Sequence, residues 1–430
     1  MKKITCIAGL AGALLAGTAA IPANAQDLDV WIRASNDSRE VYEQMAEAFE
    51  TKTGIHINYF NATTDFEQRL ARAAAGRELP DLLFNDATAM GQMEQMGIIE
   101  EVDRSKIEGA DDIYPTAWKS AEAADGKYYG VPTSAQSFAL FIRKDWREKL
   151  GLEQPKTWDE LKAMAAAFTH DDPDGNGKDD TYGFILPAST TRGYASWFMS
   201  SFMWQAGGGY LAKEGDGYKA ALPQEGNVEA MEFMRSLVCE GLTQPGAINA
   251  TTADVIPSFR SGQTGMFFTG PYHIALLDAE PGADKIEVIA PPAGPEGVAT
   301  LAEGTNVYFM KGSEKVDDAR KFVEFMISPE GQTMGMAVGT GRIPIVRLPI
   351  NKNVDTLATL KDERWGLFAK LYADAGRYVP TVPDWTPIRL DTAMGFNKIF
   401  ADCESDIPAL LEETNGTVTG ILKDQGALAE

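Results

Sequence analysis

The chain has 430 residues, a formal net charge of −23 and a hydrophobic fraction of 44%. Its length exceeds what one hydrophobic core usually covers, so we expect two lobes, and its apolar content is typical of a globular rather than a disordered protein. The acidic balance, without a basic stripe, excludes binding to nucleic acid through neutralised phosphates.

The first 25 residues have the pattern of a cleaved signal peptide. Lys2 and Lys3 precede the apolar run IAGLAGALLAGTAA, and Ala23-Asn24-Ala25 supplies a small-x-small cleavage site. A membrane anchor is disfavoured, because the apolar run is shorter than the ~20 residues that span a bilayer. We therefore expect an exported, soluble protein.

The first elements of the mature chain alternate between strand and helix patterns. The expected order is a strand at 28–35, a helix at 37–51, a strand at 55–61, a helix at 65–76 and a strand at 80–86. Apolar residues recur at helical spacing in the helices, whereas the strands are short apolar runs. This β-α-β-α-β order indicates a parallel sheet with right-handed crossovers.

The pattern changes at residues 128–132 and 137–143, where two strand-like runs adjoin without a helix between them. Adjoining strands suit a crossing from one lobe to the other, and 286–292 and 341–347 resemble two further crossings. The other elements continue the mixed pattern. We expect helices at 158–170, 194–207, 228–241, 272–280, 317–328 and 328–339, strands at 183–188, 265–271 and 304–310, and a proline-stiffened loop at 381–388.

Several phrases, in this order along the chain, resemble one protein family. They are VYEQMAEAFETKTGIHINY, LPDLLFND, DGKYYGVP with ALFIRKDW, KTWDEL, GQTGMFFTGPYHIALL and DDARKFVEFMISPEGQ. Together they resemble the carbohydrate-binding group of the extracellular solute-binding proteins of bacterial ABC importers, typified by maltose-binding protein. The resemblance covers essentially the whole mature chain. It implies a two-lobed α/β periplasmic-binding-protein fold, with three crossovers and a ligand in the interlobe cleft.

The resemblance also implies the division of the chain and its function. The N-terminal lobe would comprise residues 26–133 and 291–342, and the C-terminal lobe residues 134–290 and 343–430. Hinge closure would trap a sugar or polyol in the periplasm and deliver it to membrane-embedded ABC permease subunits, with the protein acting as a monomer. A cleft site agrees with the sheet pattern, because α/β sheets bind ligands beyond the carboxyl ends of their strands.

A sugar site needs flat aromatic rings and planar polar side chains, and both follow the predicted strands and crossovers. The candidate ligand-binding residues are Trp31, Arg33, Asn36, Asp37, Asp65, Asn85, Asp86, Gln136, Tyr194, Trp197, Tyr272, Asn306, Arg342 and Trp385. The resemblance implies an acidic sugar ligand at Asp86 and aromatic platforms at Tyr272 and Trp385. A helix cap is the alternative for Asp65 and Asp86. Glu303 and Arg389 are further candidates, although a surface ion pair is the commoner fate of such an arginine.

Two features are predicted to hold the scaffold. Residues 172–180, DPDGNGKDD, place acceptors as a twelve-residue calcium loop does, with Gly183 at the position of the usual glutamate. The expected ligands of this structural calcium ion are Asp172, Asp174, Asn176, Lys178 (through its carbonyl) and Asp180. A metal-free Asx-rich turn is the alternative. The sequence leaves open whether Cys239 and Cys403 form a disulfide.

The usual signatures of enzymes are missing. HExxH, GxSxG and GxxxxGK[ST] do not occur, and the chain has only three histidines, so we expect a binding protein that needs no cofactor. Two alternatives stay open. The acidity of the chain allows a polyamine or metal ion as ligand, and a secreted glycoside hydrolase would need two carboxylates across a cleft.

Overall fold

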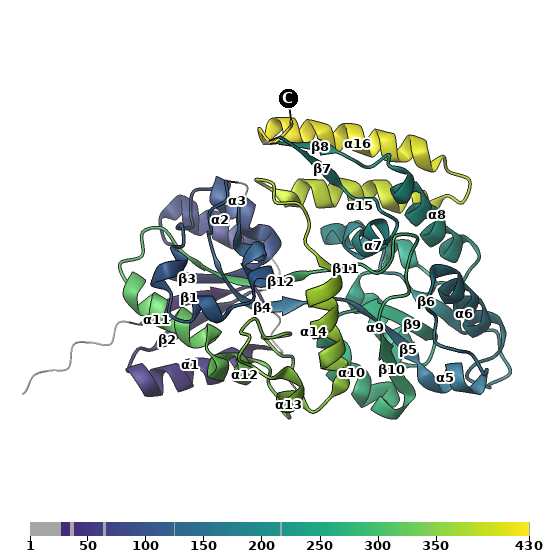
Figure 1. The fold of residues 1–430 in the computed structure, drawn as a ribbon, viewed down its shortest axis with the longest axis horizontal. Helices are drawn as coiled ribbons and strands as arrows, with labels where there is room; N and C mark the ends of the chain where they lie inside the picture. Colours follow the sequence, from purple (N-terminus) through teal and green to yellow (C-terminus); the bar gives the residue numbers. More distant parts are fainter. Residues whose placement is uncertain are drawn as a thin grey trace, which may run out of the picture.

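The structure is a computed structural model that describes residues 27–34, 38–62, 66–123, 125–215, 217–340 and 342–429. The predicted signal peptide lies outside these residues. The chain forms two lobes side by side, each built on a β-sheet with helices packed around it (Figure 1). The predicted two-lobed α/β fold is therefore confirmed.

The first lobe contains a five-stranded sheet with the strand order β2-β1-β3-β12-β4. Its strands are β1 (Leu28–Ile32), β2 (Ile57–Asn61), β3 (Leu82–Asp86), β4 (Val131–Gln136) and β12 (Glu303–Phe309). β1 runs parallel to β2 and β3, which confirms the predicted β-α-β-α-β start, whereas β12 is antiparallel to both of its neighbours. The α-helices of this lobe are α1 (Arg39–Thr53), α2 (Phe66–Gly76), α3 (Met90–Gln95), α4 (Pro115–Trp118), α11 (Val316–Ile327) and α12 (Pro329–Gly335).

Helices cover both faces of the first sheet. Side chains alternate along each strand, so each strand contributes apolar residues to both of these faces. Leu82 and Phe84 of β3 belong to the larger apolar core, which includes the buried face of α1. Leu83, between them, belongs to a second core with Phe66 of α2 and Met90 of α3. Alternate residues of β3 therefore belong to two separate cores.

The second lobe contains a four-stranded sheet with the order β10-β5-β9-β6. Its strands are β5 (Ala139–Arg143), β6 (Tyr182–Ile185), β9 (Thr264–Thr269) and β10 (Ile286–Ile289). Its helices are α5 (Lys144–Lys149), α6 (Trp158–His170), α7 (Tyr194–Gln205), α8 (Glu225–Cys239), α9 (Thr252–Arg260) and α10 (Ile274–Leu277). A hairpin of β7 (Leu211–Glu214) and β8 (Gly217–Ala220), and a short pair of β11 (Thr300–Leu301) and β13 (Gly376–Arg377), were not predicted.

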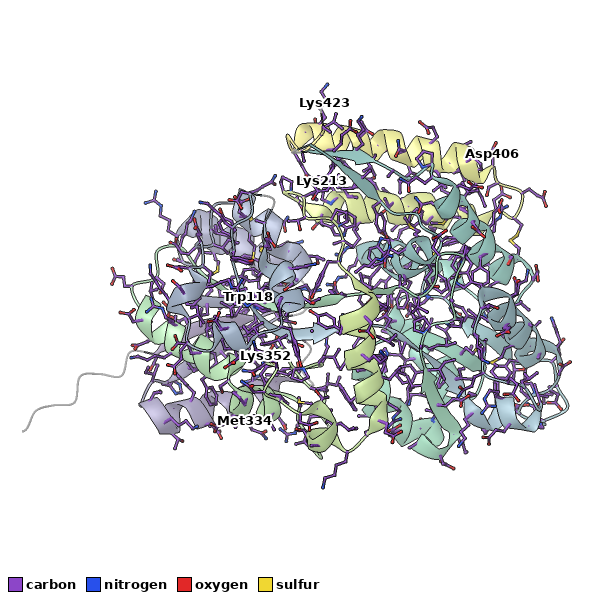
Figure 2. The ribbon with its side chains drawn as sticks, in the orientation of Figure 1. Trp118, Lys213, Met334, Lys352, Asp406 and Lys423 are labelled. Atoms are coloured by element: carbon purple, nitrogen blue, oxygen red, sulfur yellow. A yellow bond between two sulfur atoms is a disulfide. The ribbon has the colours of Figure 1, made fainter. Side chains whose placement is uncertain are left out.

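The C-terminal part of the chain is helical, as predicted. Its helices are α13 (Thr356–Leu360), α14 (Glu363–Ala375), α15 (Trp385–Ala401) and α16 (Ile407–Asp424). α14 lies between the two lobes, and α15 packs on α7 of the second lobe (Figure 1). Figure 2 shows Asp406 and Lys423 at opposite ends of α16, where an acidic cap and a late basic residue suit the helix dipole.

Helix starts follow the signals in the sequence. The Thr157 hydroxyl accepts a hydrogen bond from the backbone N–H of Glu160 at the start of α6, and the Ser328 hydroxyl accepts one from Gly331 at the start of α12. The expected loop at 381–388 is wrong in its second half, because the Asp384 carboxylate caps a helix that begins at Trp385.

The chain crosses between the lobes near the predicted segments. β4 ends in the first sheet and β5 begins in the second after a gap of two residues, and β10 of the second sheet is followed by β12 of the first. After α12 the chain runs beside β4, where Ala135 bridges Leu348 and the Arg347 N–H donates to Ser134 Oγ at 2.9 Å. The exact limits of the two lobes stay a prediction.

A disulfide between Cys239 and Cys403 joins the end of α8 to the segment between α15 and α16, with a Cα–Cα distance of 5.8 Å. The structure thus answers a question that the sequence left open. No helix within the described ranges combines the length and the apolar character needed to cross a membrane.

Candidate functional site

A cleft with a cavity volume of about 250 Å³ lies between the two sheets. Its lining comes from the ends of strands and from loops of both lobes. The lining residues are Arg33, Asp86, Gln136, Arg192, Tyr194, Trp197, Thr252, Tyr272, His273, Glu303, Arg347 and Arg389. We call this cavity and these residues the interlobe cleft.

The sheet of the first lobe brings four polar residues to one edge. Arg33 follows β1 and Asp86 ends β3, and these strands are parallel, so both residues lie at the carboxyl edge. β12 runs the other way, so Glu303 at its start pairs with Gln136 at the end of β4 on the same edge. The directions of the strands therefore bring residues that are far apart in the sequence to the same edge of the sheet.

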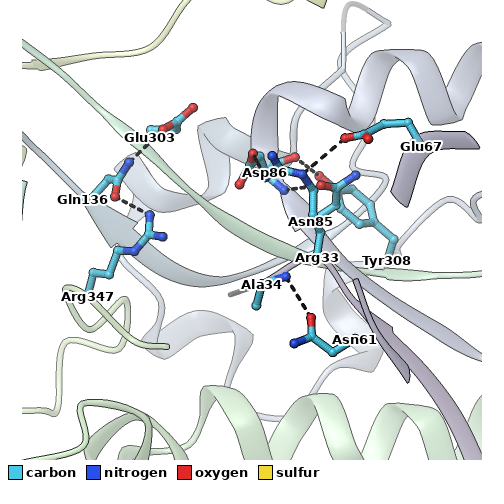
Figure 3. A network of polar contacts seen from close by, with 10 residues as sticks. All are labelled: Arg33, Ala34, Asn61, Glu67, Asn85, Asp86, Gln136, Glu303, Tyr308 and Arg347. Atoms are coloured by element: carbon cyan, nitrogen blue, oxygen red, sulfur yellow. Dashed lines mark hydrogen bonds and ion pairs between the residues drawn. The ribbon is translucent and has the colours of Figure 1, made fainter. Parts of the chain in front are cut away.

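Arg33 is held by two carboxylates. Its guanidinium makes an ion pair with Asp86 and a second one, at 3.3 Å, with Glu67 of α2 (Figure 3). The Asp86 carboxylate raises the pKa of Arg33, which stays charged although its side chain is only 12% exposed. Asp86 makes no side-chain cap to the helical turn after it, so its carboxylate is directed to this ion pair.

Gln136 connects two charged groups in the floor of the cleft. Its amide N–H donates to Glu303 Oε2 at 2.7 Å, and its carbonyl oxygen accepts a hydrogen bond from Arg347 (Figure 3). Burial raises the pKa of Glu303 to about 7, and Asp86 adds to this rise, whereas Arg389 and Arg347 oppose it. The Glu303 carboxyl group therefore titrates near neutral pH.

The second lobe supplies an aromatic corner after β9. Gly270 is needed there, because an added Cβ would lie 2.3 Å from the ring of Tyr272. The Arg347 guanidinium stands 5.0 Å from the centre of that ring, in a cation–π contact. His273 shares a 2.9 Å hydrogen bond with Thr269, and burial, followed by Arg347, lowers its pKa to about 3. His273 is therefore a neutral hydrogen-bonding group.

The second-lobe wall of the interlobe cleft also contains polar groups without partners in the described part of the chain. Trp197 of α7 packs edge-on against Phe138 and Tyr194, with ring centres 5.0 and 6.1 Å away. Trp197 Nε1 and Arg389 Nε are buried and have no hydrogen-bond partner in the described part of the chain. A buried donor without an acceptor is unfavourable unless a ligand or water supplies one. Both residues line the interlobe cleft.

The structure brings six of the predicted ligand-binding residues together in the interlobe cleft. They are Arg33, Asp86, Gln136, Tyr194, Trp197 and Tyr272. Three further predicted residues, Asn36, Asp37 and Asp65, lie outside the described residues. Ligand contact itself stays a prediction for all of them.

Other predicted residues lie away from the interlobe cleft. The Asn85 side-chain oxygen accepts from its neighbour's backbone N–H, and the Asn306 amide donates to the Ser120 carbonyl in the buried interior. Arg342 makes an ion pair with Glu40 of α1, and Trp31 packs on Phe60 with ring centres 5.0 Å apart. Each of these side chains is thus satisfied within the first lobe or its edge.

Trp385 also differs from the expectation. As the first residue of α15 it is only 4% exposed, and its ring packs edge-on against Tyr210 at 5.1 Å. It borders two smaller cavities beside the interlobe cleft rather than the cleft itself. A stacking role on an exposed loop is therefore not what the structure shows.

Two charged residues of the interlobe cleft, Arg192 and Arg347, were not predicted, and two others, Glu303 and Arg389, were only further candidates. Arg347 lies in the third crossing segment, which the sequence did reveal, but five residues beyond the arginine that was chosen. Glu303 precedes a predicted strand. Arg389 stands beside Gly193, where an added Cβ would lie 2.6 Å from its side chain, and no sequence pattern indicates this approach.

The loop at 172–180 is exposed and closed by its own hydrogen bonds. The Asp172 carboxylate accepts from the backbone N–H groups of Gly175 and Gly177 at 3.0 and 3.2 Å. The Asn176 amide donates to Asp174 at 2.8 Å and to Asp180 at 3.1 Å. Across the described ranges, no three His, Cys, Asp or Glu side chains gather closely enough to hold a metal ion. Calcium binding here stays a prediction.

Comparison with known proteins gives a consistent result. A protein of Brucella abortus, whose name indicates binding without stating a ligand, is 27% identical over 387 residues, covering 89% of this chain and 90% of its own. The GacH receptor of Streptomyces glaucescens, solved without ligand and with acarbose, has a TM-score of 0.79 at 20% identity, covering 93% of this chain and 98% of its own.

A second solved structure is maltose-bound MalE3 of T. maritima, with a TM-score of 0.78 at 21% identity, covering 92% of this chain and 100% of its own. At these identities the structural likeness shows the fold. The model of the family described as bacterial extracellular solute-binding protein matches residues 35–333.

Proposed function

The chain belongs to the family of bacterial extracellular solute-binding proteins, and from this membership we propose that its interlobe cleft binds a saccharide. In this proposal the two lobes close around the saccharide by bending at the crossing segments. The closed form is then recognised by the permease subunits of an ABC importer. The ligand drives closure only as far as it binds the closed form more tightly than the open form.

One observation carries the proposal: aromatic rings and unpartnered hydrogen-bonding groups share the same cleft. Trp197, Tyr194 and Tyr272 offer ring surfaces, and the C–H faces of a sugar pack on such rings. Trp197 Nε1 and Arg389 Nε are buried donors that find no acceptor in the described part of the chain. The hydroxyl oxygens of a sugar would accept their hydrogen bonds. The ligands of the two solved relatives, acarbose and maltose, are saccharides and support this class.

The charges of the cleft disfavour a polyamine. Four of its side chains are arginines and two are carboxylates, so a polycation would meet a net positive surface. The acidity of the whole chain, which kept a polyamine open as an alternative, is not the acidity of the cleft.

Binding without turnover is the second part of the proposal. Asp86 and Glu303 both line the cleft, and glycoside hydrolases use two carboxylates. Here Asp86 is engaged by Arg33, and Glu303 accepts a hydrogen bond from Gln136. Release of reducing ends from an oligosaccharide that the protein binds would contradict this part.

A thermal-shift screen of the mature chain with neutral sugars, acidic sugars, polyols and polyamines tests the ligand class. A true ligand raises Tm by mass action, whereas compounds that do not bind leave it unchanged. We expect at least one saccharide to raise Tm, and Trp197→Ala to abolish that rise. A rise with polyamines alone would overturn the proposal.

Three accompanying expectations concern location, assembly and metal. We propose that the protein is exported to the periplasm, acts as a monomer, and holds a structural calcium ion in the 172–180 loop. The Asp174 and Asp180 carboxylates lie together at the side-chain amide of Asn176, which supports the expected calcium ion. Fractionation, light scattering and calcium titration test the three separately.

A further inference from the structure

The interlobe cleft is basic although the chain as a whole is acidic. Its charged side chains are four arginines and two carboxylates, namely Arg33, Arg192, Arg347, Arg389, Asp86 and Glu303. The cleft therefore carries a formal surplus of positive charge in a chain whose net charge is −23. A cleft with a local potential of one sign attracts ligands of the opposite sign.

The surplus is not spread evenly over the two walls. On the first lobe, Arg33 is already matched by Asp86 and Glu67. Within the described ranges, no ion pair joins Arg192, Arg347 or Arg389 to a carboxylate, although Arg389 and Arg347 act on Glu303 through space and lower its pKa. The unmatched charge therefore lies on the second lobe and the third crossing segment.

Some part-buried arginines elsewhere in this protein have counter-ions, whereas Arg104 lies over the rings of Trp118 and Tyr128 and Arg235 donates to the Ser405 carbonyl. Arg364 is held between Asp278 and Asp362 at 2.6 Å from each, and Arg147 pairs with Glu287. A part-buried charge without a counter-ion is unfavourable, and a paired, hydrogen-bonded one is tolerated. In the cleft, three arginines without an ion pair among the described residues surround one cavity, and this concentration of positive charge suits a counter-ion on the ligand.

Two of these arginines are held in place before any ligand binds. The Arg347 guanidinium donates a hydrogen bond to Gln136 and stands 5.0 Å from the ring centre of Tyr272. These two contacts fix the orientation of the guanidinium plane. Arg389 packs against Gly193 and keeps its Nε buried and unpartnered. A preorganised guanidinium offers two parallel N–H groups, which match the two oxygens of a carboxylate.

Arg192 adds a third arginine to this wall. It is exposed and lines the cleft from the turn before α7.

We propose that the ligand is a saccharide that carries a carboxylate, as a uronic acid does, and that Arg347 and Arg389 bind this carboxylate. The inference rests on the proposed saccharide function and narrows it to acidic saccharides. Guanidinium groups bind carboxylates and phosphates alike, so the experiment below includes a sugar phosphate to distinguish the two. Burial raises the pKa of Glu303 to about 7, so partial protonation at neutral pH weakens its repulsion of a carboxylate.

Calorimetric titration of the mature chain with matched sugars tests the inference. The pairs are galacturonic acid with galactose and glucuronic acid with glucose, together with the corresponding dimers, and galactose 6-phosphate distinguishes phosphate from carboxylate. We expect at least one uronic acid to bind about tenfold more tightly than its neutral partner. Arg389→Gln should remove this preference, because glutamine keeps hydrogen-bonding groups but loses the charge.

Two variants separate charge from structure. Arg389→Lys keeps the charge and should retain part of the preference for the acid. Arg320→Gln, on the outer helix α11, should leave both affinities unchanged. Neutral sugars that bind as tightly as their acids, or galactose 6-phosphate that binds more tightly than the acids, would overturn the inference while the saccharide function stands. The absence of heat with every saccharide, acidic or neutral, would contradict the proposed function itself.

Discussion

The interlobe cleft and the 172–180 loop are both rich in polar groups, yet they use them in opposite ways. In the exposed loop, Asp172 accepts from two backbone N–H groups, and the Asn176 side chain accepts from the Lys178 N–H at 2.7 Å. In the cleft, Trp197 Nε1 and Arg389 Nε are buried and find no acceptor among the described residues. The loop completes its own structure, whereas the cleft leaves groups for a ligand. The predictions below separate these two uses.

The largest effect is expected from the disulfide, which belongs to the scaffold and lies outside the cleft. Cys239→Ser with Cys403→Ser removes a bond between positions 164 residues apart in the sequence. Loss of a native disulfide typically lowers the free energy of unfolding by about 2–5 kcal/mol. We expect denaturant unfolding to show a loss in this range, while calorimetry shows unchanged ligand affinity. A large loss of affinity in a folded variant would link the scaffold to the site and contradict the separation.

Protonation of the Glu303 carboxyl group in the cleft should affect stability. Its pKa is raised from 4.5 to about 7 in the folded state, mainly by burial, so the folded protein holds this proton more tightly than the unfolded chain. The stabilisation is complete below the unfolded pKa and is lost as the pH rises through 7. The loss is on the order of 3 kcal/mol.

Glu303→Gln, which cannot titrate, should lack this loss and be more stable than the wild type above pH 7. The carbonyl oxygen of the introduced glutamine can still accept the hydrogen bond that Gln136 donates to the carboxylate. The measurement is the free energy of unfolding by denaturant from pH 5 to 8. Parallel pH profiles for the two proteins would show that Glu303 does not titrate in this range.

A smaller effect, on affinity, is expected from Trp197. Trp197→Ala removes both the ring surface and the unpartnered Nε1–H, and loss of such an anchor costs about 2 kcal/mol, or roughly thirtyfold in Kd. Trp197→Phe keeps a ring and should lose less. Tyr114→Ala removes an aromatic side chain that is 42% exposed and outside the cleft lining, so it serves as the control. Equal losses for Trp197→Ala and Tyr114→Ala would contradict a specific role for Trp197.

The sequence predicted the fold well because local patterns determine it. Short apolar strands alternating with capped helices placed Arg33 and Asp86 after β1 and β3, and the glycine-proline turn placed Tyr272 after β9. These residues line the cleft because the parallel strands share a carboxyl edge.

The wrong and missed predictions of cleft residues have two causes. One is the face of the strand on which a side chain lies, and the other is the tertiary contact between segments that are distant in the sequence. Asn85 and Asn306 lie next to or near cleft residues in sequence, but side chains alternate along a strand, so both point into the interior of the first lobe. Arg347 reaches the cleft because its segment pairs with β4, which a single sequence does not reveal. Arg389 depends on contact between α15 and the turn before α7.

The smallest effect, and the sharpest test of the comparison, is calcium at the 172–180 loop. If this loop holds a structural ion, calcium should raise Tm by a few degrees through mass action, because only the folded loop presents the ligands together. Asp174→Asn should remove the rise, since it replaces a carboxylate that lies beside Asn176. Asp179→Asn, outside the expected ligands, is the matched control. Saccharide affinity should be the same in calcium and in chelator, because the loop leaves no group for the cleft. If a chelator abolished saccharide binding while the protein stayed folded, calcium binding in the loop would be coupled to ligand binding in the cleft, and the separation argued here would be wrong.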